Sequence, residues 1–334
     1  MSTQARILPR SFLLSRLHSL TGLWIVIFLF EHLITNSQAA LFFGEDGVGF
    51  IRMVNFLKSL PYLHVVEIGL IGIPIAYHAV LGIRYALTGK FNSYPSDGKK
   101  PYLSYGRNIA YTFQRISAWI LLIGIILHVS FMRFSIYPYE AKDGINTSYF
   151  VRLHMDTGLY TVSDRLNIKL YDQSKINEQK SQLPNLEVKI EMIKQRILEL
   201  DNSSKNVSFV QDKMNAYETL QRLEQKKEWI KTLLKRPIDA TQVIAVSKEF
   251  GSATLLNVRD AFKSPLKIAL YTLFVLAACF HGFNGLWTFC MSWGVMIKVA
   301  SQKKVLRFCI AMMILLAFLG LSSVWGTYFF NLKN

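Results

Sequence analysis

The chain has 334 residues, of which 51% are hydrophobic and 18% charged, and it carries 38 Lys and Arg against 22 Asp and Glu. The apolar residues form long blocks, which excludes a disordered or collagen-like chain and disfavours a simple soluble enzyme. Residues 139–264 hold 20 basic and 17 acidic residues, whereas the rest of the chain holds 18 and 5. The basic excess therefore accompanies the apolar blocks, as in cytoplasmic loops of a membrane protein, and does not indicate a nucleic-acid-binding surface.

Five apolar segments are each long enough to cross the roughly 30 Å hydrocarbon core of a bilayer as a helix. They run from Leu17 to Phe43, Leu63 to Leu87, Ile109 to Phe134, Leu266 to Met296 and Leu306 to Phe330. The first is too long for a signal-peptide core and lacks a small-residue cleavage site, so we expect it to remain as a transmembrane helix. The sequence predicts an all-α membrane protein with a five-helix bundle, divided at residues 1–138, 139–264 and 265–334.

Lysine and arginine gather in alternate connections between these segments. They are Arg6, Arg10 and Arg16 before the first segment, Lys90, Lys99, Lys100 and Arg107 between the second and third, and Lys298, Lys303, Lys304 and Arg307 between the last two. Positive charge is retained on the cytoplasmic side of a membrane. We therefore expect a multi-pass protein of the bacterial cytoplasmic membrane, with a cytoplasmic N-terminus and an extracytoplasmic segment 139–264.

The polar segment 139–264 predicts a folded insertion between the third and fourth helices. Apolar residues recur at spacings of three and four from Leu186 to Leu200, and again from Phe209 to Leu234, which indicates an antiparallel helical hairpin with a turn at residues 202–204. Before it, polar and apolar residues alternate over Tyr149–Asp172, which is compatible with a β-hairpin that turns at Asp156–Gly158. No Gly-rich nucleotide loop or metal-ligand cluster stands out within this insertion, so a spacer or docking module is its favoured interpretation.

Four of the seven histidines lie deep in four different apolar segments: His32, His78, His128 and His281. One such histidine is usually a packing residue, but four are harder to explain because a polar group in lipid is costly and normally functional. At a rise of about 1.5 Å per residue, His32 and His128 come nearer the outer surface, and His78 and His281 nearer the inner surface. The four histidines therefore form two pairs at two depths.

Two pairs of imidazoles at two depths are what two b-type haems need, because each iron takes one axial ligand from either side of the ring. A structural zinc site would place four ligands at one depth, which this arrangement excludes. A proton relay of histidines stays open, with Glu31 and Glu67 as the available carboxylates. Glycines in the spans, such as Gly22 and Gly282, would let a flat macrocycle or a neighbouring helix approach the backbone.

The motifs around these histidines resemble the cytochrome b subunit of succinate:quinone oxidoreductases. They are Arg16–Gly22 (RLHSLTG), Glu31–Leu33 (EHL), Tyr77–Gly82 (YHAVLG), Phe113–Ile116 (FQRI), Phe280–Trp287 (FHGFNGLW) and Trp293-Gly294. The most similar type is the single-subunit, five-helix, di-haem anchor of succinate dehydrogenase and fumarate reductase, of the b558 type. The resemblance covers about residues 10–135 and 265–330, with the four histidines in matching order and spacing.

The resemblance implies that His32 and His128 are the axial ligands of the outer haem b, and that His78 and His281 are those of the inner one. It also implies two partners on the cytoplasmic face, a flavoprotein with covalent FAD and an iron–sulfur subunit. Electrons from succinate, in a step of the tricarboxylic acid cycle, would pass through these partners and both haems to a membrane quinone, in this type usually menaquinone. The chain itself would hold no succinate site and no catalytic residue of that reaction.

Polar residues near the ends of the spans are further candidates. Those towards the inner surface are Arg16, His18, Ser19, Arg84 and Arg115. They would contact an inner haem propionate or the iron–sulfur partner, although each arginine could equally be an interfacial residue that snorkels to water. Glu67 lies one turn into the second span on the outer side, where it could hydrogen-bond a quinone or deliver protons to it.

The sequence departs from that family in two places and leaves two other functions open. The insertion of about 100 residues is not part of the usual short anchor, and Cys279 stands where some fumarate-reducing members have a glutamate proposed for proton movement. One alternative is the cytochrome b subunit of another respiratory complex, of the hydrogenase or formate dehydrogenase type. The other is a non-redox membrane scaffold or sensor in which the insertion is the functional part.

Overall fold

The computed structural model describes residues 9–42, 44–89, 105–201 and 207–334. The chain divides into a membrane unit (Met1–Leu41, Phe56–Phe131 and Ser264–Gly326) and an insertion unit (Phe42–Asn55, Met132–Lys263 and Thr327–Asn334). The insertion unit thus begins at Met132, before the predicted boundary at 139, and includes two further segments, Phe42–Asn55 and Thr327–Asn334. The basic loop residues Arg6, Lys90, Lys99 and Lys100, and the turn expected at residues 202–204, lie outside the described residues.

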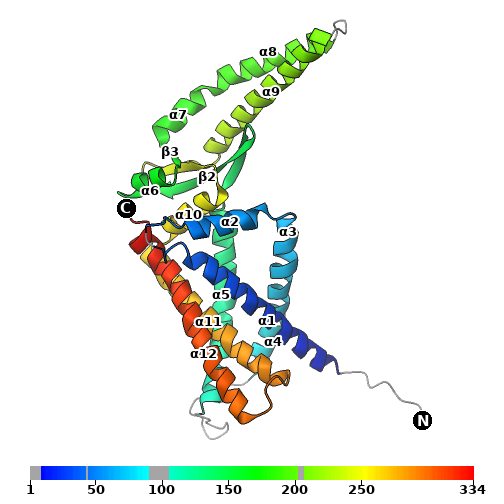
Figure 1. Cartoon of the computed structure of the whole chain (residues 1–334), viewed down its shortest axis with the longest axis vertical. Coiled ribbons are helices and arrows are strands. Elements are labelled where there is room, and N and C mark those ends of the chain that lie inside the picture. Colours follow the sequence, from blue (N-terminus) through cyan, green and yellow to red (C-terminus); the bar gives the residue numbers. More distant parts are fainter. Residues whose placement is uncertain (1–8, 43, 90–104, 202–206) are drawn as a thin grey trace, which may run out of the picture. The chain divides into compact units, whose positions relative to one another are not determined.

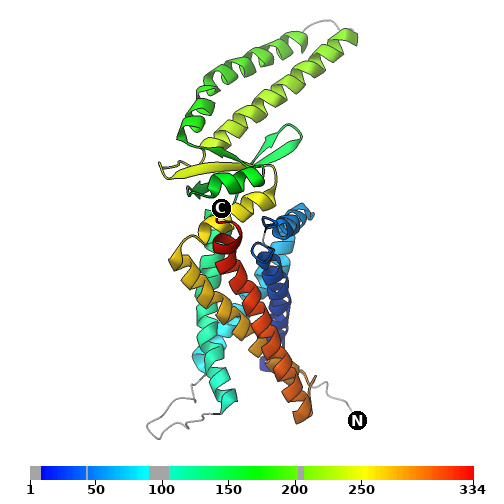
Figure 2. The same ribbon diagram turned by 60° about the vertical axis from the view of Figure 1, so that its left-hand side comes forward.

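Five helical segments within the described ranges are long and apolar enough to cross a membrane: Arg10–Ser37, Leu63–Thr88, Gly106–Ser135, Pro265–Ser292 and Val299–Asn331 (Figures 1 and 2). They correspond to α1 (Arg10–Ser37), α3 (Leu63–Val66) with η1 (Glu67–Gly72) and α4 (Ile73–Thr88), α5 (Gly106–Val129) with η2 (Ser130–Ser135), α11 (Pro265–Ser292), and α12 (Val299–Leu321) with η3 (Ser322–Asn331). The η segments are turns of the wider π-helix. The predicted fold class, an all-α membrane protein with five spanning helices, is confirmed.

The ends of the helices differ from the predicted ones by several residues, for local reasons. α11 ends at Ser292 and not at Met296, because Gly294 adopts a φ of 71° and its N–H bonds back to the carbonyl of Met291. The connection after α1 contains a helix that the sequence did not predict, α2 (Val48–Ser59).

The second span is interrupted at Pro74, and a tryptophan from α1 compensates for the interruption. Proline has no N–H and cannot bond to the carbonyl four residues earlier, which here belongs to Leu70. The indole Nε1 of Trp24 donates to that carbonyl at 2.5 Å. A broken backbone bond in a spanning helix is tolerated when a neighbouring helix satisfies the carbonyl, and the wide turns of η1 lie directly before Pro74.

α11 packs against α1, α5 and α12, and α1 packs against α4, α11 and α12, so these two helices form the centre of the membrane unit. Small residues allow these close approaches. A Cβ on Gly124 of α5 would meet the ring of Phe274 at 2.4 Å, and a Cβ on Gly320 of α12 would meet Val275 at 2.7 Å. α4 packs against α1 and, through fewer contacts, against α5.

The insertion unit is built on a four-stranded antiparallel sheet in the order β1-β2-β4-β3. The strands are β1 (Tyr139–Asp143), β2 (Asn146–His154), β3 (Lys169–Tyr171) and β4 (Gln242–Ser247). β1 and β2 form a hairpin that turns at Gly144, which has a φ of 65°. β4 completes the sheet although it follows β3 by about 70 residues, so the helical hairpin lies between these two strands in the sequence.

The β-hairpin expected over Tyr149–Asp172 is wrong in its position. The chain does turn at Asp156, whose carboxylate accepts the N–H of Gly158 at 3.0 Å, but it then enters α6 (Leu159–Arg165). Leu159 and Val162 are fully buried at helical spacing, which explains why this stretch does not continue as a strand. β2 and β3 both pair with β4 and not with each other.

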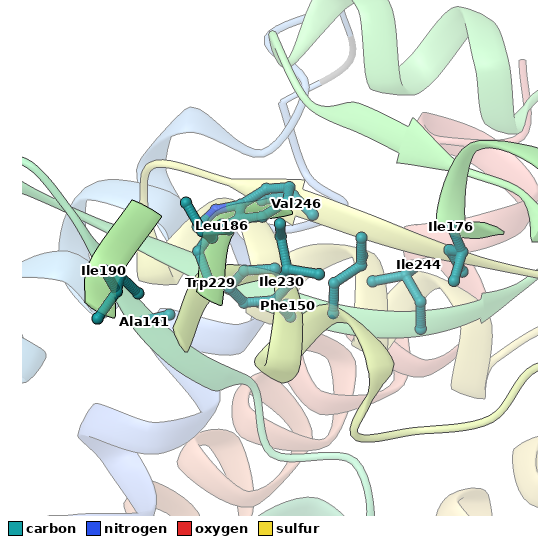
Figure 3. Packing of buried hydrophobic residues seen from close by; sticks show 10 residues of the cluster. Ala141, Phe150, Ile176, Leu186, Ile190, Trp229, Ile230, Ile244 and Val246 are labelled. Atoms are coloured by element: carbon teal, nitrogen blue, oxygen red, sulfur yellow. The ribbon is translucent and has the colours of Figure 1, made fainter. Parts of the chain in front are cut away.

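The two long helices of the insertion are α8 (Leu183–Asp201) and α9 (Val207–Leu234), which pack against each other as their periodicity predicts, with α7 (Gln173–Ser181) before them. Their lower ends join the sheet in one apolar cluster (Figure 3): Ala141, Phe150, Ile176, Leu186, Ile190, Trp229, Ile230, Leu233, Ile244 and Val246. Strand side chains alternate between faces, so Val243 and Ala245 lie on the other face, where α10 (Phe250–Ala261) packs against β2 and β4.

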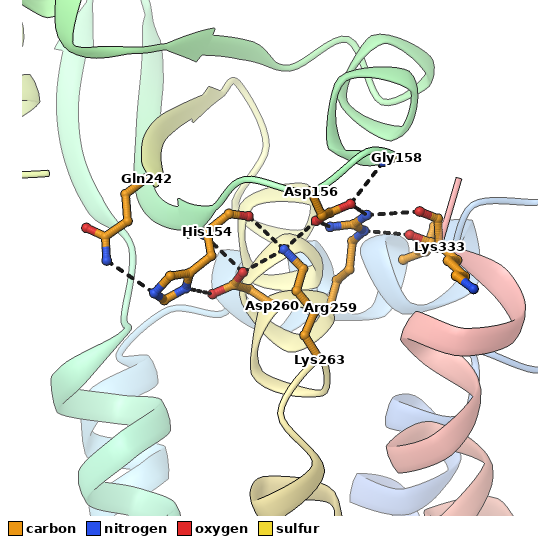
Figure 4. Close-up of polar contacts among 9 residues, drawn as sticks. His154, Asp156, Gly158, Gln242, Arg259, Asp260, Lys263 and Lys333 are labelled. Carbon is orange, nitrogen blue, oxygen red and sulfur yellow. Dashed lines mark hydrogen bonds and ion pairs between the residues drawn. The ribbon is translucent and has the colours of Figure 1, made fainter. Parts of the chain in front are cut away.

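A buried ion-pair network links β2, α10 and the C-terminal segment of the insertion unit (Figure 4). Arg259 of α10 is 1% exposed and donates to both carboxylate oxygens of Asp156 at 2.7 Å, and to the carbonyls of Leu332 and Lys333. Lys263 contacts Asp156 and also donates to Asp260 at 2.9 Å. The network therefore ties together segments that are distant in the sequence.

Candidate functional site

Four histidines from four helices meet in two pairs inside the membrane unit. The ring centroids of His32 in α1 and His128 in α5 are 5.9 Å apart, and those of His78 in α4 and His281 in α11 are 6.3 Å apart. The ring planes are nearly perpendicular, at 84° and 80°. The structure therefore brings together the same partners that their depths in the sequence paired.

The two pairs are separated along the helices that carry them. The pairs are named inner (His78 and His281) and outer (His32 and His128) after the sides on which the sequence predicts them. His18 stacks on His78 with 4.0 Å between ring centroids, so His18 marks the level of the inner pair on α1. At about 1.5 Å per residue, His32 lies roughly 20 Å further along the same helix. α5 gives an independent measure of this separation. Gln114 of α5 contacts His281, and His128 follows Gln114 by 14 residues, the same spacing as from His18 to His32. The pairs thus occupy two levels of one bundle.

The inner pair is oriented by hydrogen bonds at Nδ1. His78 Nδ1 donates to the carbonyl of His18 at 3.0 Å, and His281 Nδ1 donates to the carbonyl of Gln114 at 3.2 Å. The hydroxyl of Ser117 also lies 3.2 Å from His281 Nδ1. A hydrogen bond at Nδ1 fixes the tautomer whose lone pair is on Nε2, as in histidines that bind a metal. In both residues this tautomer leaves the lone pair on Nε2, the nitrogen that could bind a metal.

The spacing of each pair fits an iron that already has four porphyrin ligands. Two imidazoles that bind one metal from opposite sides, at about 2 Å per metal–nitrogen bond, have ring centroids about 6 Å apart. A bare metal ion usually takes three or four protein ligands. Within the described part of the chain, no group of three or more His, Cys, Asp or Glu could hold one. The donor set of two imidazoles per level therefore fits a haem.

Buried polar atoms near the inner pair also fit a ligand with carboxylate groups. His18 Nδ1, Tyr77 Oη and Trp287 Nε1 are buried and have no hydrogen-bond partner among the described residues. His18 stacks on His78, Tyr77 precedes it, and Trp287 follows His281 by less than two turns. Each such atom costs about 1–3 kcal/mol when it stays unsatisfied. A haem propionate would accept hydrogen bonds from donors of this kind.

Gly22 of α1 makes room for the inner pair. A Cβ at this position would lie 2.9 Å from Cε1 of His78, a distance that real Cβ atoms do not reach. Gly69, by contrast, has no heavy atom within 4 Å of a Cβ built on it. Of these two glycines, only Gly22 is required by its surroundings.

Two further candidates at the inner end of the bundle connect α1 to the end of α11. Arg16 donates to the carbonyl of Ser292, and its guanidinium lies 5.3 Å from the ring centroid of Trp293. Ser19 accepts a hydrogen bond from Nε1 of the same tryptophan at 3.2 Å. Arg16 and Ser19 therefore hold a helix junction next to His18.

The other two arginines differ strongly in exposure. Arg115 is 8% exposed, donates to the carbonyl of Tyr85 at 3.0 Å, and lies 4.5 Å from the ring centroid of Tyr111. It passes so close to Gly89 that a Cβ there would overlap the guanidinium, at 1.0 Å from Nη2. Arg84 is exposed. Arg115 thus has an architectural role between α4 and α5.

Glu67, the candidate for quinone contact, lies at the start of η1. Its carboxylate is 3.4 Å from Nδ1 of His64, one turn earlier, and the side chain is 36% exposed. The two residues form a protonatable pair at the end of the second span.

Sequence reasoning missed the residues that orient the histidines. Gln114 is the main one: its amide donates to the carbonyl of His281 at 3.2 Å, and its side-chain oxygen accepts from Asn284 at 2.8 Å. Ser117 and Tyr271 contact His281 and His128. The signal was polar side chains within apolar segments, but their partners are about 140 to 170 residues away.

Comparison with known proteins supports the same family. The chain is 38% identical over 121 residues to the "Succinate dehydrogenase cytochrome b558 subunit" of Bacillus subtilis (strain 168), a match that covers 36% of this chain and 54% of that relative. The chain thus spans about half the length of the curated relative it matches. No family model and no solved structure matches the chain. The resemblance seen in the motifs is confirmed over that matched region.

Proposed function

We propose that the chain is the cytochrome b subunit of a succinate:quinone oxidoreductase, a membrane anchor that binds two b haems and passes electrons to a membrane quinone. One observation carries the proposal: two histidine pairs, each drawn from two helices, have ring separations of 5.9 and 6.3 Å at two levels of the bundle. The 38% sequence identity to a cytochrome b558 subunit over 121 residues also supports the proposal.

In this proposal His32 and His128 hold the outer haem, and His78 and His281 hold the inner one. When bound, each haem supplies reversible one-electron redox chemistry. The chain contributes the orientation of its imidazoles through the carbonyls of His18 and Gln114. It also contributes a bundle in which the two levels are roughly 20 Å apart along α1, so that electrons can move across the bilayer.

The partners follow from the same assignment. An iron–sulfur subunit and a flavoprotein with FAD would dock on the cytoplasmic face, near Arg16 and Ser19, and deliver electrons from succinate. The quinone, menaquinone by family resemblance, would react near the outer pair, where Glu67 and His64 are the available proton carriers. The insertion unit would be extracytoplasmic. The chain would therefore carry the quinone site of the complex but no succinate chemistry.

The test is to purify the chain from its native membrane with the subunits that accompany it. The proposal expects two haems per chain in a pyridine haemochrome assay, a b-type α-band on reduction, and reduction of that band by succinate in the intact complex. A colourless protein would contradict the proposal and favour a scaffold or sensor. A haem protein that accompanies a hydrogenase or formate dehydrogenase would replace succinate dehydrogenase with another respiratory complex.

A further inference from the structure

Two side chains of α11, Tyr271 and Phe274, contact the ring of His128. Nδ1 of His128 lies 3.0 Å from the hydroxyl of Tyr271, and the two ring centroids are 5.7 Å apart. The ring of Phe274, one turn further along α11, lies 5.8 Å from that of His128. Gly124, one turn before His128, admits the Phe274 ring where any Cβ would collide with it. The close approach of α5 and α11 therefore places Tyr271 on His128.

The inner and outer levels differ in what accepts the Nδ1 hydrogen bond. His78 and His281 each bond to a backbone carbonyl, of His18 and Gln114 respectively. His128 bonds to a phenol hydroxyl instead. A carbonyl is a strong acceptor that belongs to every residue type, whereas the hydroxyl exists only because residue 271 is a tyrosine. Hydroxyls also lie near Nδ1 at the inner level, that of Ser117 at 3.2 Å from His281 and that of Thr21 at 3.4 Å from His78, but there each Nδ1 has a carbonyl acceptor as well. The orientation of His128 therefore depends on a side chain, whereas the inner histidines also have backbone acceptors.

We propose that Tyr271 is a positioning residue of the outer pair, which fixes the ring of His128 with Nε2 towards His32 and sets the redox potential of the outer site apart from that of the inner site. This inference rests on the proposed function. If Nε2 binds iron, Nδ1 carries the proton and Tyr271 accepts it as a hydrogen bond. An acceptor at Nδ1 makes the imidazole a more basic ligand, and second-shell hydrogen bonds of this kind tune the iron.

This chemistry determines the direction in which the midpoint potential of the outer haem changes when the Tyr271 hydroxyl is removed. A more basic imidazole donates more electron density and stabilises the ferric state over the ferrous state. Removal of the acceptor therefore weakens that preference and raises the midpoint potential of the outer haem. The inner haem keeps its carbonyl acceptors and its potential.

The experiment is a potentiometric titration of the α-band in the purified complex with Tyr271→Phe. Tyr111→Phe is the matched control, because this ring also lies in the membrane unit but is 44% exposed and contacts Arg115. His32→Ala, which should retain only the inner haem, identifies the inner signal. We expect Tyr271→Phe to shift only the outer potential, upwards, and to change the low-spin ferric EPR signal of that haem, while Tyr111→Phe changes neither.

Each outcome decides the inference. Selective loss of the outer haem in Tyr271→Phe, with the inner signal intact, would also support it, since the ring of His128 would have lost its orientation. Two haems with wild-type potentials would overturn it, and so would loss or shift of the inner haem. If wild-type protein binds no haem, or His32→Ala retains both haems, the proposed function fails instead, so the two failures are distinguishable.

Discussion

Arg259 and Asp156 form a two-point ion pair inside the insertion unit, with both guanidinium–carboxylate distances at 2.7 Å and the arginine 1% exposed. The same guanidinium also donates to the carbonyls of Leu332 and Lys333, so it joins the turn after β2, α10 and the C-terminal segment. A buried charge that loses its partner is expensive, because its desolvation is no longer compensated. The pair is therefore a sensitive point of the insertion unit.

Arg259→Met should destabilise the insertion unit by about 1–3 kcal/mol, less than the cost of about 3–5 kcal/mol for breaking a fully buried ion pair, because Asp156 is 16% exposed and keeps Lys263 as a partner. Arg165→Met is the control: Arg165 pairs with Asp46 at 2.9 Å but is 36% exposed, and an exposed pair contributes about 1 kcal/mol or less. Hydrogen exchange of the β2 and β4 amides in the full-length protein in detergent measures both effects. Equal losses in the two variants would show that burial does not determine the importance of Arg259.

The acid stability of the insertion unit should depend on Asp156. Burial alone would raise its pKa, but hydrogen bonds from Arg259 and Lys263 and their positive charges lower it from 3.8 to about 2. Because the folded state has the lower pKa, the stabilisation is complete above about pH 4 and is lost as the pH falls towards 2. Hydrogen exchange across this window should show a weaker pH dependence in Arg259→Met than in wild type; parallel curves would contradict this origin.

Gly22→Ala should lower the haem content of the inner site. The new Cβ would lie 2.9 Å from Cε1 of His78, so the ring must move away from the position in which it faces His281. Gly69→Ala is the control, because a Cβ there meets no atom within 4 Å. A pyridine haemochrome assay should give fewer than two haems per chain for Gly22→Ala and two for Gly69→Ala. Equal haem content would refute the steric role of Gly22.

Trp24→Phe should destabilise the membrane unit by about 0.6 kcal/mol, the average for hydrogen bonds between transmembrane helices, and by no more than about 1.7 kcal/mol, the largest such value. The effect should shrink in a Pro74→Ala background, because an alanine at 74 supplies an N–H that can bond to the carbonyl of Leu70. Unfolding in mixed detergent micelles, arranged as a double-mutant cycle, measures this coupling. Additive effects would show that Trp24 does not compensate for Pro74.

The sequence predicted the elements whose signal is local. The five spans follow from apolar length, and α8 and α9 follow from apolar residues at spacings of three and four. The sheet was missed because β4 pairs with a strand about 90 residues earlier, and no local pattern indicates such a partner. Tyr149–Asp172 was misassigned because alternation extends past Asp156, where an Asx turn starts a helix.

In the candidate site, too, the features with a local sequence signal could be predicted and the contacts between distant residues could not. The histidine pairs could be predicted because helix direction and rise fix the depth of each residue. Their neighbours could not, because the acceptor of a hydrogen bond depends on helix rotation and close approach. Gln114 contacts His281 across 167 positions, and Tyr271 reaches His128 only because Gly124 brings α5 and α11 together.

The pairing of the histidines on two haems is tested by the haem content of the four single variants His32→Ala, His78→Ala, His128→Ala and His281→Ala, with His64→Ala as the control. Wild type and the control should each bind two haems. His32→Ala and His128→Ala should lose the same haem, identified by its midpoint potential, and His78→Ala and His281→Ala should lose the other. Losses that pair His32 with His78 or His281, or four variants that all retain two haems, would contradict this pairing.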